Sequence, residues 1–442
     1  MEQQFIDIYS QAHNPLDKNS AAIFNAHRKQ AFESATKLPF PTTKTEEYLY
    51  CPLFSALTTD WGINFSRLKF GLTAEKMFHC AVPGIKATTA YFINDVWAAK
   101  EPFVDLGNGA FVCTMRYACE VYPQIIEKHY HTALTDDNDG FVNLSNLLVQ
   151  DGFLLYVPKN IALSQPLQFV NMMRAGQPLL GTNRNLIVLE EGAKVDIIDC
   201  DHSMDENPYF AIRNTEIKVG ANAHFGYTLM ESTHTAMNNL RRYAVASERD
   251  SKIEMALFNL ENGNSRNHVE VDLNGEGANV WIGGMLLADK QQRTDNYTLI
   301  RHHAPHCKSK ELFKYILDDE AVGGFSGRIV VDHGAQKTES YQTNRNICIS
   351  PKAKALGRPQ LEIYADDVKC GHGATTGMLD EAALFYMQQR GIGLKEARML
   401  LLQAFSTEVI DHISIPALAD RLRLLIEKRL RGESMRCAGC IK

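Results

Sequence analysis

The stretch NLIVLEEGAKVDIID, residues 185–199, holds two apolar, β-rich runs joined by a short turn. Val, Ile and Leu are frequent in buried strands, and a small residue such as Ala193 suits a sharp bend of the backbone. The same arrangement recurs along the chain. The turns EGAKV, VGANAHF, RDSKI, EGANV, PHCKS, HGAQK and PKAKA hold, in this order, Ala193, Ala221, Ser251, Ala278, Cys307, Ala335 and Ala353.

Successive turn positions are about 28 residues apart, a period typical of solenoids, and only the last pair, Ala335 and Ala353, is closer together. Two strands and two turns fit in such a unit, and stacked units pair strand over strand in parallel. We therefore predict a mainly β protein with a parallel β-helix core, right-handed by the general rule for crossovers. An antiparallel sandwich is the alternative, but Asn262-Gly263 and Asn274-Gly275 do not lie between well-matched short strands.

The repeat divides the chain into four predicted parts. Residues 1–150 are expected to form a mixed α/β, largely helical domain, in which residues 20–37 suit a helix. The β-helix core is predicted over residues 151–376, and a C-terminal helical domain over residues 377–432. Residues 433–442 are expected to form a flexible tail.

The C-terminal part changes to a helical period. Asp380 is predicted to cap the helix DEAALFYMQQR, and Gly391 to end it. Ser414 and Pro416 are expected to open a third helix. Residues at helical spacing on the second and third helices are Ala397, Leu401, Ala404, Phe405, Leu418, Leu422, Leu425 and Arg429. Three short helices bury little alone, so they should pack on the last coil or present a face to a partner.

Composition excludes several classes of function. The chain has 442 residues, 45% of them apolar, and a net charge of −6, which gives no basic surface for nucleic acid. The N-terminal sequence does not have the pattern of a signal peptide, and no apolar run approaches the length of a membrane span. We therefore expect a cytoplasmic protein that does not contact a membrane, with its ten cysteines reduced.

The stretch DDVKCGHGATTG, residues 366–377, carries the most concentrated candidate chemistry. Its glycines give G-x-G-x-x-x-G, which is one residue too long for a dinucleotide fingerprint, and the chain has no phosphate-binding P-loop. Residues i and i+2 of a strand face the same side, so Cys370 and His372 should project together. Both suit iron or an iron–sulfur cluster, but one thiol and one imidazole cannot complete a metal shell. On the residues alone, a metal-ligand role and a purely structural role both stay open.

Two further groups of ligand-type residues are present. RHHAPHC contains His302, His303, His306 and Cys307, but one short loop does not wrap a tetrahedral metal, and a turn between strands is the preferred interpretation. A peripheral iron contact is the alternative there. The tail contains Cys437 and Cys440 as a lone C-x-x-C, to which no role is assigned.

The C-terminal half resembles the SufB/SufD family of iron–sulfur cluster assembly proteins. The resemblance is strongest in RPQLEIYADDVKCGHGATTGMLDEAALFYMQQRGI, residues 358–392, and extends over residues 302–346 and 396–405. KTEEYLYCPL and DGFLLYVPKN, at residues 44–53 and 151–160, also look like that family. Within it, the chain is more similar to the SufD branch, because LEIYADD lacks the cysteine of SufB and H-G-A-T replaces H-E-A-T.

This resemblance implies a non-catalytic scaffold subunit that pairs its β-helix with a SufB-like paralogue and binds a SufC-like ATPase. It implies that His372 faces the SufB cysteine at a nascent-cluster site, with Cys370 beside it. It also implies that the C-terminal helices dock the ATPase, through the region of Phe385, Tyr386, Arg390 and Gly391. Iron or a cluster would be held transiently with SufB rather than stably by the isolated chain, which is expected to form a homodimer in the absence of its partners.

Two other functions are kept as alternatives. A β-helix enzyme acting on carbohydrate would need carboxylates or basic residues aligned on one face of the coils, and would normally be secreted. A purely structural adaptor would use Cys370 and His372 only for packing.

Overall fold

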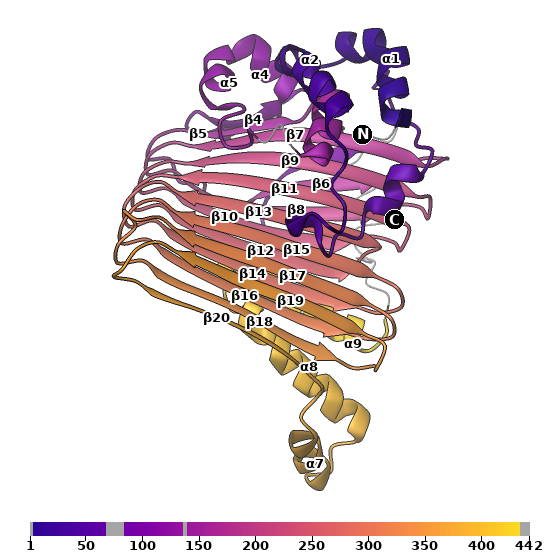
Figure 1. Ribbon diagram of the computed structural model, residues 1–442, viewed down its shortest axis with the longest axis vertical. Coiled ribbons are helices and arrows are strands. Elements are labelled where there is room, and N and C mark those ends of the chain that lie inside the picture. The colour runs from indigo at the N-terminus through magenta and orange to yellow at the C-terminus, as the bar shows by residue number, and fades with distance from the viewer. Residues whose placement is uncertain (1–2, 68–83, 136–138, 434–442) are drawn as a thin grey trace.

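The computed structural model describes residues 3–67, 84–135 and 139–433. These residues form a β-solenoid of stacked coils, with helices covering one end and one side (Figure 1). The predicted parallel β-helix core is confirmed. Apart from residue 433, the predicted tail, with Cys437 and Cys440, lies outside the described residues.

The solenoid consists of two sheets, each with ten strands among the described residues. Sheet 1, in spatial order, contains β2 (Val96–Trp97), β1 (Thr88–Ile93), β6 (Leu167–Met173), β8 (Lys194–Ser203), β10 (His224–Ser232), β12 (Lys252–Glu261), β14 (Asn279–Ala288), β16 (Lys308–Leu317), β18 (Glu339–Cys348) and β20 (Lys369–Gly377). Sheet 2 contains β19 (Lys354–Ile363), β17 (Val322–Val331), β15 (Arg293–His302), β13 (Asn264–Leu273), β11 (Met237–Ser247), β9 (Tyr209–Val219), β7 (Leu179–Leu189), β5 (Phe153–Val157), β4 (Ala110–Thr114) and β3 (Phe103–Gly107). The sheets therefore begin at residue 88, within the range predicted as an N-terminal domain.

The strand register confirms the length of the predicted repeat and shows which of its turn residues were assigned wrongly. Strands β8 to β20 of sheet 1 begin at positions 194, 224, 252, 279, 308, 339 and 369, so the coil length is nearly constant. The residue before β10 is the buried Ala223 rather than Ala221, and the residue before β18 is Thr338 rather than Ala335. Ala353 precedes β19 of sheet 2, which pairs with β17. The short final spacing of the predicted repeat was therefore wrong, because it joined turns from opposite edges of the coil.

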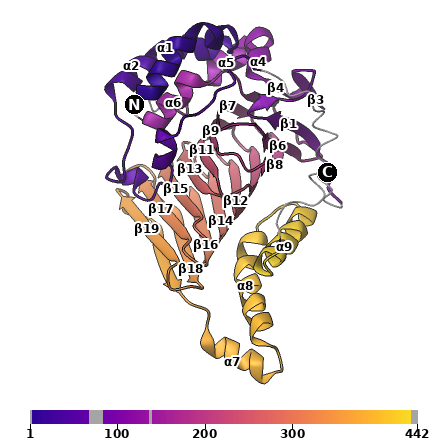
Figure 2. The same cartoon turned by 90° about the vertical axis from the view of Figure 1, so that its right-hand side faces the viewer.

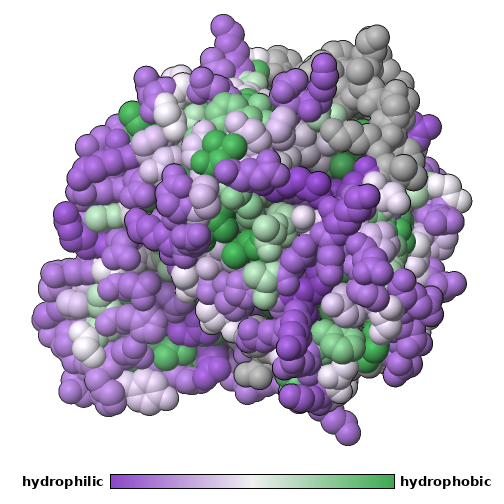
Figure 3. All heavy atoms as spheres, turned by 90° about the horizontal axis from the view of Figure 1, so that it is seen from above, coloured by the Kyte–Doolittle hydropathy of each residue, from purple (hydrophilic) through white to green (hydrophobic). Residues whose placement is uncertain are grey.

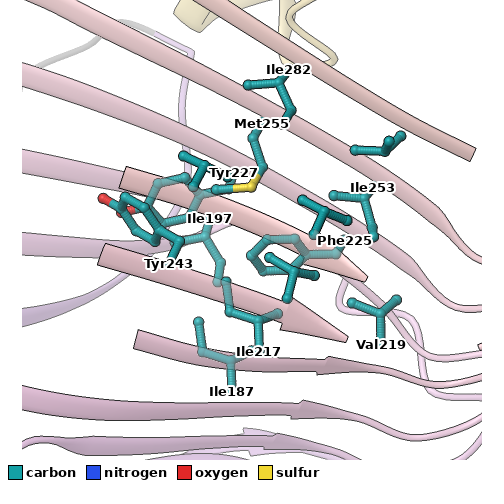
Figure 4. Packing of buried hydrophobic residues seen from close by; sticks show 14 of the residues in the cluster. Ile187, Ile197, Ile217, Val219, Phe225, Tyr227, Tyr243, Ile253, Met255 and Ile282 are labelled. Carbon is teal, nitrogen blue, oxygen red and sulfur yellow. The ribbon is translucent and has the colours of Figure 1, made fainter. Parts of the chain in front are cut away.

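Inward-facing side chains of the two sheets fill the solenoid with a continuous apolar core. Successive coils stack equivalent residues in register: Ile197, Tyr227, Met255 and Ile282 follow one another along sheet 1. Figure 4 shows these residues packed inside the coils. Burial of such aliphatic side chains stabilises the solenoid by about 2 kcal/mol each.

Helices and short turns cover the outer face of sheet 2 at the N-terminal end (Figure 2). They are α1 (Gln3–Lys18), α2 (Ala22–Lys37), α4 (Met115–Val121), α5 (Pro123–His129), α6 (Gly140–Leu148), η1 (Glu46–Tyr48) and η2 (Phe54–Thr58). The helix predicted over residues 20–37 corresponds to α2, whereas α1 was not predicted. From above, this end of the molecule is mostly hydrophilic, with some apolar residues gathered near the middle of the view (Figure 3).

The three predicted C-terminal helices are α7 (Glu381–Gln389), α8 (Leu394–Ile410) and α9 (Pro416–Leu430). Asp380 caps α7, as predicted, and Gly391 ends it with a φ of +85°, which glycine adopts without strain. Helix α8 buries Leu402, Val409 and Ile410 rather than Ala404, which is exposed. The predicted stripe was correct at Ala397, which is buried, and at Phe405, which packs against the apolar cluster, but it was wrong at Ala404. On α9 the predicted residues Leu418, Leu422 and Leu425 are buried.

Helices α8 and α9 do not stack on the last coil. They fold back over the outer face of sheet 1 and cover apolar side chains of earlier coils (Figure 2). In this cluster Leu418, Leu422 and Ile426 of α9 join strand residues that include Phe258 and Met285. Of these three helices, α7 lies farthest beyond the sheets (Figure 2). The outer face of sheet 1 therefore needs α8 and α9 as cover.

Candidate functional site

The two sheets end at β19 and β20, which form the C-terminal open end of the solenoid (Figure 1). Each has a neighbour on one side only among the described residues, so its outer backbone groups form a free sheet edge. Strand β19 contains Pro359, which has no backbone N–H and is typical of edge strands. Strand β20 contains no proline, and most of it is exposed. Its edge is suited to pairing with another strand.

Cys370 and His372 both lie on β20 and point to the inner side of the coil. Cys370 is partly buried and packs against the apolar core of the solenoid. His372 is two residues further along, so it faces the same side, but it is exposed at the open end. In the parallel register, Cys370 stands over Ser340 and His372 over Gln342 of β18. The structure thus brings the two predicted ligands to one face of the terminal strand.

The surroundings of Cys370 favour the neutral thiol. Partial burial raises the pKa of Cys370, and a hydrogen bond with the backbone of Ser340 offsets part of this effect. A metal ligand must be a thiolate, so Cys370 would lose its proton on binding a metal. His372 is the more accessible of the two ligands, because its side chain is not covered by a further coil.

Within the described residues, Cys370 and His372 do not form a complete metal site. Across residues 3–67, 84–135 and 139–433, no group of three or more His, Cys, Asp or Glu side chains is placed to hold a metal ion. An iron–sulfur cluster commonly takes four protein ligands, of which a thiol and an imidazole supply two.

The inward-facing residues of sheet 1 that are in register with His372 form a column across the coils. This column changes from apolar to polar side chains toward the open end. After Ile282 the column continues with Glu311, Gln342 and His372, each in register with the next. Glu311 and Gln342 are buried, and the Gln342 side-chain amide donates a hydrogen bond to a Glu311 carboxylate oxygen. Burial raises the pKa of Glu311 to about 7. We did not predict these residues from the sequence.

Replacing Glu311 with glutamine is expected to make stability less dependent on pH. The folded-state pKa of Glu311 is raised above its unfolded value, so the wild type takes up a proton on folding and loses stability as pH rises from about 5 to 8. A glutamine cannot ionise, and above pH 7 the variant should be more stable by up to about 3 kcal/mol. Urea unfolding at several pH values measures this difference. Glu276→Gln, in an exposed turn, is the control. If the free energy of unfolding depended on pH in the same way for the wild type and Glu311→Gln, the raised pKa of Glu311 would be contradicted.

The histidine group 302–307 does not converge on one point. His302 is buried inside the coil, with its Nε2 2.9 Å from Ser309 Oγ. His303 lies at the surface, between Asp272 and Asp332 of adjacent coils. His306 is exposed, and the Cys307 thiol donates a hydrogen bond to a backbone carbonyl oxygen. The group forms a turn between β15 and β16, so the interpretation as a turn is correct.

The predicted docking residues lie on α7 and directly after it. Phe385 and Tyr386 are 62% and 60% exposed, although both are large and apolar or amphipathic. The Arg390 guanidinium donates a hydrogen bond of 3.0 Å to Tyr386 Oη and lies over its ring. Gly391 only provides the turn into α8. Exposed aromatic residues on a protruding helix are typical of an interaction surface.

Comparison with known proteins gives the family. Residues 172–405 match the family described as "SUF system FeS cluster assembly, SufBD core domain", and residues 1–169 match the SufBD protein N-terminal region. The chain belongs to the SufBD family, and its role is in iron–sulfur cluster assembly. Among the described residues, no helix is long and apolar enough to cross a membrane.

Relatives in several bacteria are similar over most of the chain. An iron–sulfur cluster assembly SufBD family protein of Synechocystis is 26% identical, over 91% of this chain and 90% of the relative. The iron–sulfur cluster assembly protein SufD of Escherichia coli is 28% identical, over 69% of this chain and 74% of the relative. SufD of Bacillus subtilis is also 28% identical, over 73% and 75% respectively. The relatives named SufD agree with the branch that the sequence resembles.

Proposed function

We propose that this chain is a SufD-type scaffold subunit, which contributes half of a nascent-cluster site to a complex with a SufB-type paralogue and a SufC-type ATPase. The observation that carries the proposal is the position of His372 and Cys370. They share the inward face of a terminal strand that has one free edge, and the described chain provides no further ligands beside them. His372 would be the main ligand and Cys370 a weaker second. The bound iron or cluster is cargo, which the complex assembles and passes on.

The free edges explain how a second solenoid would complete the site. A strand added to β20 would continue sheet 1 and bring its own inward-facing side chains next to His372. Either parallel or antiparallel pairing would satisfy the free backbone groups of β20. If no strand were added, the exposed edge would favour aggregation. In the absence of the paralogue, the same edge would support the homodimer expected for the isolated chain.

The surface of α7 is the proposed docking site for the ATPase. Helices α8 and α9 are fixed to sheet 1, where Lys314 donates a hydrogen bond of 2.9 Å to the Phe405 backbone carbonyl and pairs with Glu408. Helix α7 contacts α8, and Leu384 is the single residue of this helix that is buried. Its exposed aromatic residues are therefore free to enter a pocket of a partner.

Replacing Phe385 and Tyr386 together with aspartate is expected to abolish association with the SufC-type ATPase. Both side chains are exposed, so the fold should be unaffected, while loss of two aromatic anchors typically costs about 2 kcal/mol or more each. Co-purification from cells that express all three subunits measures the effect. Leu424→Asp, an exposed apolar residue on α9, is the matched control and should leave association intact. Retention of the ATPase by the double variant would contradict this docking site.

The carbohydrate-enzyme alternative receives no support from the buried carboxylates of sheet 2. Glu216 accepts hydrogen bonds from Arg184 and from the backbone N–H groups of residues 131–134, beneath the N-terminal helices. Glu270 is bound by Arg242 and Arg301. Carboxylates committed to ion pairs stay ionised and cannot act as a general acid. We infer that the chain is a scaffold rather than an enzyme.

A further inference from the structure

Gln342 occupies the position directly beneath His372 inside the solenoid. The two residues are register partners on adjacent parallel strands, so their side chains leave the sheet on the same side. Gln342 is only 1% exposed, whereas His372 lies at the open end. The opposite wall has a glycine at this level: a Cβ atom on Gly327 of β17 would lie 2.1 Å from Gln342 Nε2. The coil therefore leaves space for the amide of Gln342 by omitting a side chain.

One half of this amide is held and the other half is not. Nε2 donates to the Glu311 carboxylate, which fixes which way the amide points. Oε1 is buried and has no hydrogen-bond partner anywhere in the described chain. A buried acceptor without a donor costs about 1–3 kcal/mol, so the site favours any N–H that reaches it. The next residue of the column, on the open side, is His372.

We propose that Gln342 is a positioning residue for His372: its Oε1 accepts a hydrogen bond from one ring N–H of His372, and the other ring nitrogen faces the open end. A neutral imidazole carries one N–H and one lone pair, and the hydrogen bond decides which nitrogen keeps the proton. The nitrogen left with the lone pair is the one that can bind iron. Oriented histidine ligands with such a partner are general in metal sites.

Glu311 and Gly327 help to fix the position of the Gln342 amide. The ionised Glu311 prevents rotation of the Gln342 amide, because a flipped amide would bring Oε1 against a carboxylate oxygen and Nε2 toward His372. Gly327 provides the room for the amide. The inference rests on the proposed function for the role of His372 as a ligand, but the proposed hydrogen bond does not require iron. It can therefore be measured on the iron-free chain.

The test is nuclear magnetic resonance of the full-length chain labelled with ¹⁵N-histidine, at an alkaline pH where imidazole is neutral. The His372 signals are assigned by their loss in His372→Asn. We expect one tautomer to predominate in the wild type, and Gln342→Leu to shift the ring nitrogens toward the mixture of free histidine. Gln342→Glu combined with Glu311→Gln keeps an acceptor at position 342 and a donor at position 311, so this double variant should restore the single tautomer. Gly327→Ala should displace the amide and act as Gln342→Leu does.

Asn344→Leu is the matched control, because Asn344 is also a buried amide of β18 and occupies the next inward-facing position of that strand. Its substitution should leave the His372 tautomer unchanged. A His372 tautomer that is the same in wild type and Gln342→Leu would overturn the inference, whatever the cluster yield.

A second readout separates this inference from the proposed function. In the complex with the SufB and SufC homologues, Gln342→Leu should reduce the yield of iron–sulfur cluster about ten-fold, more than Asn344→Leu does. If His372→Ala leaves the yield unchanged, the ligand role fails while the tautomer result stands. If His372→Ala lowers the yield but Gln342→Leu changes neither the tautomer nor the yield, the positioning role alone fails.

Discussion

Replacing His372 with alanine is expected to reduce iron–sulfur cluster formation by the reconstituted three-subunit complex about ten-fold or more. Loss of a residue that only orients a ligand already costs ten-fold or more in metal affinity, and loss of the ligand itself should cost at least as much. His372 is exposed on the terminal strand, so its side chain contributes little to core packing. The variant should therefore fold and assemble like the wild type. Iron and acid-labile sulfide per complex, together with the visible absorption of the cluster, measure the effect.

Thr375→Ala is the control, because Thr375 is an exposed residue of the same strand that faces the other side. It should leave the cluster yield unchanged. Cys370→Ala should reduce the yield less than His372→Ala, in keeping with the partial burial and raised pKa of its thiol. An unchanged yield with His372→Ala, in a complex that contains all three subunits, would remove His372 from the site.

Replacing Asp201 with alanine is expected to lower the free energy of unfolding by about 3–5 kcal/mol. Asp201 lies inside the coil, where it accepts two hydrogen bonds of 2.9 Å from Arg213 and pairs with Arg241. Burial alone would raise the pKa of Asp201, but the two guanidinium groups hold it below its usual value. The variant would leave both cations buried without this anion. Denaturant unfolding, followed by circular dichroism, measures the loss.

Asp420→Ala is the control for a surface pair of the same kind. Asp420 is 76% exposed and pairs with Arg423 one helical turn away. Exposed pairs contribute about 1 kcal/mol or less, so its loss should be small. Equal destabilisation by Asp201→Ala and Asp420→Ala would show that the buried pair does not stabilise the solenoid. As pH falls and Asp201 becomes protonated, the wild type should lose stability more steeply than Asp201→Ala.

The repeat in the sequence predicted the fold, because each coil has to turn sharply and bury the same faces. It was less reliable at individual turns. Small residues occur at more than one position of a turn, so Ala221 was chosen where Ala223 is the buried residue. The two edges of a coil carry similar turns, and Ala353 was therefore assigned to the wrong one. Only the strand register distinguishes these cases.

The site could be predicted in part. Alternation along a strand was sufficient to put Cys370 and His372 on one face. Glu311 and Gln342 were missed because they lie two coils and one coil before His372, and they reach it only through the strand register. The signal was present in the spacing, since these polar residues repeat at the coil length. The position of α8 and α9 could not be predicted, because helical periodicity does not say which surface a helix covers.

The packing of α8 and α9 also changes how the docking helix should be tested. Deleting residues 379–442 would uncover the apolar cluster that includes Phe258 and Met285 on sheet 1. Loss of the ATPase by such a truncated chain would not separate docking from misfolding. Point substitutions on α7 avoid this difficulty, because Phe385 and Tyr386 are exposed.

The central claim is that the chain holds half of a cluster site. It is tested most directly by the iron and sulfide content of the protein prepared without oxygen, alone and in complex with its SufB- and SufC-type partners. We predict a cluster in the complex that depends on His372, and none retained by the chain alone. A stable cluster on the isolated chain, or a complex with full cluster content after His372→Ala, would contradict the account.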